Sequence, residues 1–228
     1  MVMPARVYTA RERSFDRLEH VAIAITLLRR SPGQQHVGIL HKDESLGEVR
    51  MLHLLWHNRL GNAQPEPSYA WIVPPIPRRR ARQVAAFCRN VHRANPSGIP
   101  YAFSQASDCF NDQTGAFLMG TARKGLTCAT FVLGVFHSTG LPLIQYETWP
   151  TSREGDEQWQ RHIIEELKAG GAPLQHIRDV ESEVGSVRYR PEDVAGAAAA
   201  GSIPAPFAEA YPLAQAILAR LRTEGLST

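Results

Sequence analysis

Strand-like segments fill the first third of this chain, and helical segments follow them. We predict strands at 6–10, 20–28, 35–41, 48–55 and 69–73, although the alanines of 20–28 are also compatible with a helix. We predict helices at 78–95, 127–138, 153–169 and 206–222, with a further helix starting at 190–194. Strands that precede helices, rather than alternating with them, favour an α+β fold with an antiparallel sheet.

The composition narrows the class of protein. The chain has 228 residues, 43% of them hydrophobic, and a net charge of +3, so nucleic acid is not an expected partner. Its three cysteines are widely spaced and form no CxxC pair, which argues against a disulfide framework and a zinc site. We find no signal peptide and no apolar run of about 20 residues, so we expect a cytoplasmic protein, with export by another route left open.

The segment 124–136 places a cysteine at the start of an apolar helix. The Thr127 hydroxyl can accept a hydrogen bond from the first turn, and Cys128 follows it, where the helix dipole favours an anion. We therefore expect the Cys128 thiol to ionise more readily than a free thiol. Apolar residues at spacings of three and four bury one face: Phe131, Val132, Val135 and Phe136. A small buried thiol in a core helix is the alternative.

Two histidines on successive predicted strands supply a base. His36 and His53 can stand side by side in an antiparallel pair, so His36 can take the proton of Cys128 while His53 orients its ring. His41 should point to the opposite face, and His57 is the alternative for the third position. Two ordinary half-buried strand histidines are the other interpretation. Four other histidines lie in predicted helices or loops without a partner motif, and we expect them at the surface: His92, His137, His162 and His176.

These motifs together resemble a known superfamily. The run from His36 to Leu40 reads HVGIL, and the run from Met51 to Leu54 contains His53, as in the paired strands of the NlpC-like papain-fold peptidases. The segment Thr127-Cys128-Ala-Thr-Phe-Val resembles their nucleophile helix. Here the cysteine follows the histidines, which resembles the circularly permuted branch that includes lecithin:retinol acyltransferase-like proteins. The resemblance covers roughly residues 20–140.

The resemblance implies a papain-like, permuted α+β fold in which the sheet precedes the nucleophile helix. A catalytic domain would span 1–150, and 151–228 would form a helical extension packed on or beside it. Cys128, with His36 and His53, would attack an amide, ester or thioester carbonyl. The Cys128 backbone N–H would stabilise the oxyanion, with Thr127 and Tyr101 in support, and no cofactor or metal is expected.

The resemblance leaves the reaction open. A hydrolase for a peptide or small amide is the main interpretation. An acyltransferase or thioesterase for lipid substrates is one alternative, although those acyltransferases carry Asn before the cysteine and Glu and His after it, where this chain has Thr127, Ala129 and Thr130. A non-catalytic binding protein that retains the fold is the other. We also expect the irregular segment 97–123 to line a site and 195–201 to be a linker or frayed helix.

Overall fold

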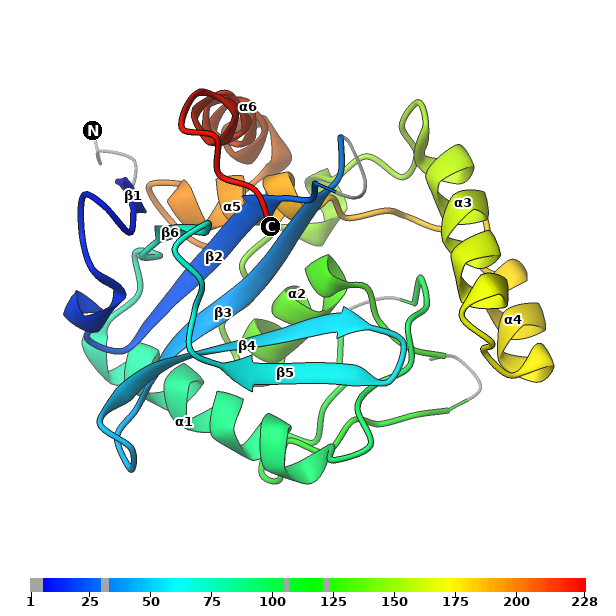
Figure 1. The fold of residues 1–228 in the computed structure, drawn as a ribbon, viewed down its shortest axis with the longest axis horizontal. Helices are drawn as coiled ribbons and strands as arrows, with labels where there is room; N and C mark the ends of the chain where they lie inside the picture. The colour runs from blue at the N-terminus through cyan, green and yellow to red at the C-terminus, as the bar shows by residue number, and fades with distance from the viewer. Residues whose placement is uncertain (1–5, 30–32, 105–106, 121–123) are drawn as a thin grey trace.

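The computed structural model describes residues 6–29, 33–104, 107–120 and 124–228. Within them the strands form a six-stranded, fully antiparallel sheet in the order β1-β6-β2-β3-β4-β5 (Figure 1). The strands are β1 Val7–Thr9, β2 Val21–Leu27, β3 Gln35–Asp43, β4 Glu48–Trp56, β5 Arg59–Ala63 and β6 Ala70–Ile72.

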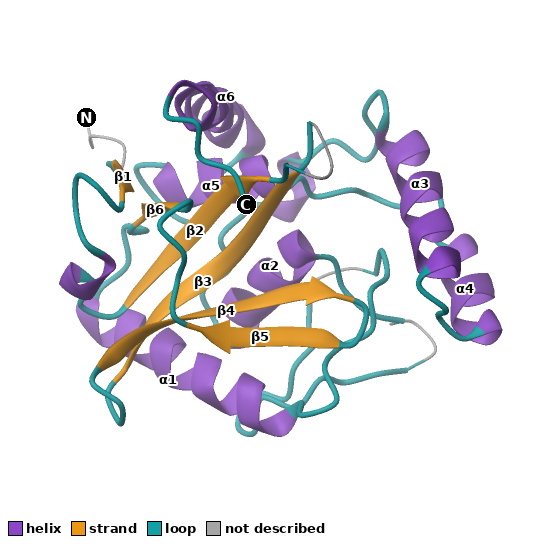
Figure 2. Ribbon diagram, in the orientation of Figure 1, coloured by secondary structure: helices purple, strands orange, loops and turns teal. Residues whose placement is uncertain are grey.

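Six α-helices accompany this sheet in the described residues, so the α+β prediction is confirmed (Figure 2). They are α1 Arg78–Ala94, α2 Cys128–Ser138, α3 Asp156–Ala169, α4 Leu174–Glu181, α5 Pro191–Ala199 and α6 Phe207–Thr223. Short 3₁₀ turns lie at Phe15–Arg17 and Tyr146–Thr148. No described helix combines the length and apolar character that crossing a bilayer requires.

The sheet opens between β3 and β4. The register of this pair runs from Asp43↔Glu48 to Ile39↔Leu52 and ends there in the described residues, although both strands continue. Figure 1 shows β4 and β5 turning away from β2 and β3, with α2 behind the opening. The first half of β3 therefore leaves its β4-side backbone groups free to meet another part of the chain.

The two faces of the sheet are covered differently. The strand residues Ile23, Ile39 and Leu52 are fully buried in one large core together with apolar residues of α1, α2 and α5. On the other face, Trp71 belongs to a smaller core and stacks on Tyr8 of the N-terminal segment, with ring centroids 5.0 Å apart. Period-two alternation in β2, β3 and β4 assigns their side chains to these two cores.

The alanine- and glycine-rich segment is part of the core. Every residue of α5 is buried, so the expectation of a linker or frayed helix at 195–201 is wrong as far as Ala199. A methyl group on Gly196 would overlap the backbone of Ala210 in α6. Small side chains therefore let two helices pack backbone to backbone, and here a low-complexity composition indicates close packing rather than disorder.

Residues 226–228 pair with the last residue of β2, Leu27. The N–H of Leu27 donates to the Leu226 carbonyl (3.2 Å), and the N–H of Thr228 donates to the Leu27 carbonyl (3.0 Å). The Thr26 hydroxyl also reaches the Leu226 carbonyl at 3.4 Å. The large core likewise draws on residues from both 1–150 and 151–228, so the C-terminal segment packs directly on the sheet.

Most predicted elements are present, and two observed elements were not predicted. β5 lies in a stretch for which no strand was predicted, because Arg59–Ala63 is a short, half-exposed edge strand without β-branched residues. α4 has only eight residues and a single pair of buried side chains. α2 is buried from Cys128 to Phe136, rather than on one face, because the sheet, α1 and α5 surround it.

Candidate active site

Cys128 is the first residue of α2, and the preceding residue caps this helix. The Thr127 hydroxyl accepts from the N–H of Thr130 (3.1 Å), and the Thr130 hydroxyl accepts from the N–H of Thr127 (2.8 Å). This reciprocal pair is a capping box built from two threonines. It confirms the predicted cap and fixes the direction in which the first turn presents the sulfur.

Backbone N–H groups from two elements act to lower the pKa of the Cys128 thiol, namely those of Val37 in β3 and Ala129 in α2. The β2–β3 ladder uses even-numbered residues of β3, since the N–H of Leu28 donates to the Gln34 carbonyl at 3.0 Å. The N–H of Val37 therefore points away from β2 and into the opening of the sheet. The Val37 N–H that acts on this thiol therefore lies on the side of β3 that β4 leaves unpaired.

Burial dominates the acidity of this thiol. Cys128 is only 7% exposed, and burial raises its pKa to about 11, although the N–H groups of Val37 and Ala129 act in the opposite direction. The expectation of an easily ionised thiol is therefore wrong for the resting site. The helix N-terminus is in place, but its favourable field does not offset the loss of water around the sulfur.

His36 and His53 form a direct pair across the opening. The Nε2 atom of His36 and the Nδ1 atom of His53 are 2.9 Å apart, and the rings meet edge to face. When the Nε2–H of His36 donates to His53, the Nδ1 atom of His36 is left as a proton acceptor. The structure thus brings together the two predicted histidines, in the arrangement that a base and its orienting partner require.

Two glycines make room for His53. A methyl group on Gly38 would lie 2.8 Å from the Cβ atom of His53, and a methyl group on Gly61 would lie 2.6 Å from its Nε2 atom. Gly38 lies opposite His53 if the β3–β4 register is extended, and Gly61 is its partner in β5. The absence of a side chain on both neighbouring strands lets the ring of His53 lie close to the sheet and reach His36.

Both imidazoles are held neutral. Burial, reinforced by His53, lowers the pKa of His36 to about 3, and burial lowers the pKa of His53 to about 4. With a neutral thiol on Cys128, the resting site carries no thiolate–imidazolium pair. In the described residues the sulfur has no hydrogen bond to the His36 ring, so proton transfer requires the closer approach that substrate binding commonly brings.

Tyr101 stands beside the start of α2. Burial raises the pKa of Tyr101, which keeps its hydroxyl protonated, although the nearby backbone N–H of Cys128 acts in the opposite direction. The ring packs on Trp56 with centroids 4.8 Å apart. His57 accepts from the N–H of Tyr101 (3.3 Å), and His176 contacts its carbonyl (3.0 Å). His57, the alternative for the third position, therefore supports Tyr101 instead.

The other histidines play no such part. His41 is fully buried and its Nε2 atom lies 2.8 Å from Oδ1 of Asn62, outside the residues that line the site. His92 is exposed, as expected, whereas His137 is half-buried beside Asp108. His162 is also exposed but lies on the rim of the pocket described next, which its sequence context did not indicate.

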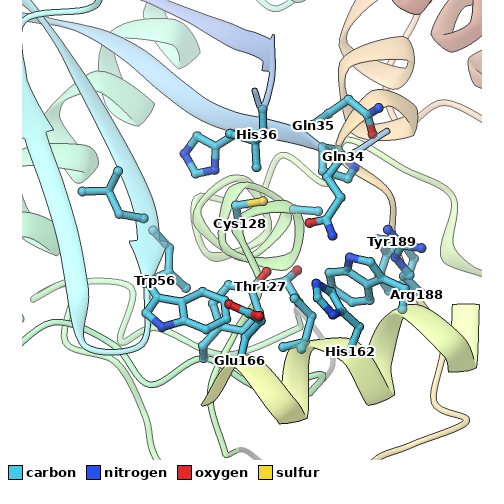
Figure 3. A pocket seen from close by; sticks show the side chains of 18 residues that line it. Gln34, Gln35, His36, Trp56, Thr127, Cys128, His162, Glu166, Arg188 and Tyr189 are labelled. Atoms are coloured by element: carbon cyan, nitrogen blue, oxygen red, sulfur yellow. The ribbon is translucent and has the colours of Figure 1, made fainter. Parts of the chain in front are cut away.

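Cys128 and His36 line one pocket of about 210 Å³. Figure 3 shows the imidazole and the sulfur at the same end of this pocket, with Trp56 on one side and Arg188 on the other. The wall on the Arg188 side comes from α3 and from the segment before α5, through Trp159 and Tyr189. The C-terminal segment therefore completes the site.

Sequence reasoning did not identify this second wall. The spacing of Trp159, Ile163, Ile164 and Leu167 predicts that all four form the core stripe of their helix, and Arg188 has no motif around it. Ile163, Ile164 and Leu167 are buried as predicted, but Trp159 is only partly buried and turns toward the pocket. A tryptophan at the edge of an amphipathic stripe is the only local sign of this role.

Comparison with protein-family models, with curated proteins and with solved structures finds no match to this chain. The described residues also contain no cluster of three or more His, Cys, Asp or Glu side chains that could hold a metal ion. The geometry and electrostatics of the site are therefore what indicate its function.

Alkylation tests the ionisation of Cys128 directly. We expect its rate of modification by iodoacetamide to rise about tenfold per pH unit from pH 7 to pH 10, because the thiolate fraction grows below a pKa of about 11. Cys88 and Cys109 are fully buried and should react more slowly. Intact mass and peptide mapping give the rates, with Cys128→Ala as the control. A plateau below pH 7 would instead reveal an ion pair with His36.

Proposed function

We propose that this protein is a thiol hydrolase that cleaves an amide bond in a peptide or small amide through Cys128, His36 and His53. The observation that carries the proposal is the hydrogen-bonded histidine pair at the end of a pocket where a helix N-terminus presents a cysteine. A nucleophile, a base and a group that orients the base are the parts that covalent acyl transfer requires. The permuted papain-like fold remains part of this proposal.

The first half of the reaction forms a thioester. As the Cys128 sulfur attacks the substrate carbonyl, its proton passes to Nδ1 of His36, whose Nε2–H stays bonded to His53. The oxyanion accepts from the backbone N–H of Cys128 and from the protonated hydroxyl of Tyr101. Collapse of the tetrahedral intermediate breaks the C–N bond, and His36 returns the proton to the leaving amine.

The second half releases the acid. Water attacks the thioester carbonyl while His36 removes one of its protons, and the C–S bond then breaks. The Cys128 sulfur regains the proton from His36, so the neutral resting pair is restored. Because both groups start neutral, charge develops only when substrate fills the pocket and excludes water.

The pocket favours this reaction over lipid acyl transfer. Its walls carry Gln35, Arg188 and the rim residues His162 and Glu166, together with the aromatic rings. A long acyl chain requires a continuous apolar channel, whereas a small polar amide suits a short pocket with mixed walls. We therefore place a peptide or small amide ahead of an acyl lipid.

An activated ester tests the proposal. We expect p-nitrophenyl acetate to acetylate the wild-type protein on Cys128, with a burst of p-nitrophenol and an adduct visible by intact mass. Peptide mapping distinguishes Cys128 from Cys88 and Cys109, and Cys128→Ala should lose both the burst and the adduct. No acylation of Cys128, or equal acylation of Cys128→Ala, would favour the binding-protein alternative.

A further inference from the structure

Arg188 is a buried cation on the wall of the candidate active site. Its side chain is 14% exposed, and its guanidinium lies over the ring of Trp159, 3.9 Å from the ring centroid. It precedes α5 outside any helix and lines the same pocket as Cys128. Figure 3 shows it on the other side of the pocket from Trp56. Arg188 takes no part in the proposed acylation and hydrolysis steps.

The hydrogen bonds of Arg188 are incomplete. Its Nη1–H donates to Oδ1 of Asp156 at 3.3 Å, the one hydrogen bond that its side chain makes in the described part of the chain. Its Nε atom is buried and has no partner. Its Nη2 group makes no hydrogen bond in the described residues and is not among the buried unpaired atoms, so its N–H donors are accessible to a ligand atom in the pocket.

The charge of Arg188 is also only partly compensated. Asp156 is shared with Arg190, whose Nη2 atom lies 2.9 Å from the same oxygen, and with Arg153 at 3.8 Å. Glu192 is near enough to act on Arg188 electrostatically, but no described ion pair joins them, and burial raises the pKa of Glu192. Arg188 therefore holds positive charge that an anion in the pocket can meet.

This charge is close to the reacting atoms. Arg188 lowers the pKa of Cys128, and its field also reaches the Tyr101 hydroxyl. Because Arg188 and Cys128 line the same pocket of about 210 Å³, a group bound by Arg188 lies near the carbonyl that Cys128 attacks. Trp56 and Trp159 add apolar surface to the same pocket.

We propose that Arg188 binds a carboxylate of the substrate, so that the amide cleaved by Cys128 belongs to a compound with a free carboxylate close to the scissile bond. A planar guanidinium with free N–H donors matches a carboxylate in shape and charge. Acidic acyl groups and terminal amino acids have this chemistry. The inference rests on the proposed function, because Cys128 defines which bond lies beside the subsite.

Two matched esters test the subsite. The mono-p-nitrophenyl ester of glutaric acid and p-nitrophenyl pentanoate have acyl chains of equal length, and only the first ends in a carboxylate. We expect the wild-type protein to be acylated at Cys128 about 10–100-fold faster by the glutarate ester, the effect of a hydrogen bond to a charged group. In Arg188→Gln this rate ratio should fall to about one.

Arg190→Gln is the matched control, because Arg190 also binds Asp156 but does not line the pocket. It should keep the preference for the glutarate ester. Equal loss of the preference in both variants would assign the effect to the ion-pair network and overturn a direct contact. Equal rates for the two esters in the wild-type protein would overturn the subsite while the hydrolase stands.

A binding measurement separates the two proposals. In Cys128→Ala we expect glutarate, but not glutaramide, to raise the melting temperature, and Arg188→Gln should remove this shift. If neither ester acylates the wild-type protein but glutarate still gives the shift, the hydrolase proposal fails and the carboxylate subsite stands. If glutarate gives no shift, the subsite fails.

Discussion

Replacement of His36 by asparagine is expected to slow the acylation of Cys128 by p-nitrophenyl acetate about 10²–10⁴-fold at pH 7.5, the usual contribution of a general base. With a thiol pKa of about 11, hardly any thiolate is present at this pH, so attack depends on proton transfer to His36 during the reaction. Asparagine has no atom that can take this proton.

The pH profile distinguishes loss of a base from loss of structure. As the pH approaches 11, hydroxide ionises Cys128 without help, so the rate deficit of His36→Asn should shrink toward zero. His92→Asn, at an exposed histidine of α1, should follow the wild-type profile throughout. A deficit that stays constant from pH 6.5 to pH 10.5 would contradict a role for His36 as the base.

Replacement of Gly38 or Gly61, the two glycines beside His53, by alanine should disturb the site through steric overlap rather than through loss of the base. In Gly38→Ala the new methyl group meets the Cβ atom of His53 at 2.8 Å and the Leu52 carbonyl at 3.2 Å, and neither can move without the strand. We expect the free energy of unfolding to fall by about 1–3 kcal/mol, the usual cost of overpacking, measured by urea denaturation.

Gly61→Ala should lose activity at a smaller cost in stability. Its methyl group meets only side-chain atoms, namely the ring of His53 and a methyl group of Leu55, so the ring can rotate away and the strands can stay in place. Rotation breaks the 2.9 Å bond to His36, and acylation of Cys128 should slow while the urea midpoint changes little.

Gly120→Ala is the control for both variants, because a methyl group there meets nothing within 4 Å. It should match the wild-type protein in stability and acylation. A Gly61→Ala protein that acylates at the wild-type rate would show that the position of the His53 ring has no effect on the reaction.

The parts of this site that depend on neighbouring residues in the chain could be predicted from the sequence. Strand alternation around His36 and His53 and the cap at Thr127 depend on neighbours in the chain, and each is found where it was predicted. The pKa of Cys128 could not be derived in this way, because it depends on how much water the packed sheet and helices leave around the sulfur. The helix N-terminus alone predicted a lowered pKa for Cys128, whereas burial raises it.

The pocket wall that carries Arg188 had no pattern in the sequence that indicated it. Arg188 reaches the pocket because Asp156 and Trp159 hold its guanidinium, and neither contact can be read from the residues beside it in the chain. A helix was predicted to start at 190–194, but the complete burial of Pro191–Ala199 was not predicted, for a related reason. Its small residues match a flexible linker in composition, and only the close approach of α6 distinguishes the two.

The backbone pairing between Leu27 of β2 and residues 226–228 affects the order in which the protein can fold during synthesis. Thr26 and Leu226 are 200 residues apart in the sequence, and the wall that carries Arg188 is also synthesised late. The ribosome releases the strands with His36 and His53 well before the segments that close the pocket around them. Contacts of such long range slow folding, so the Cys128 thiol gains its enclosed surroundings only after the segments around Arg188 and Leu226 have been synthesised.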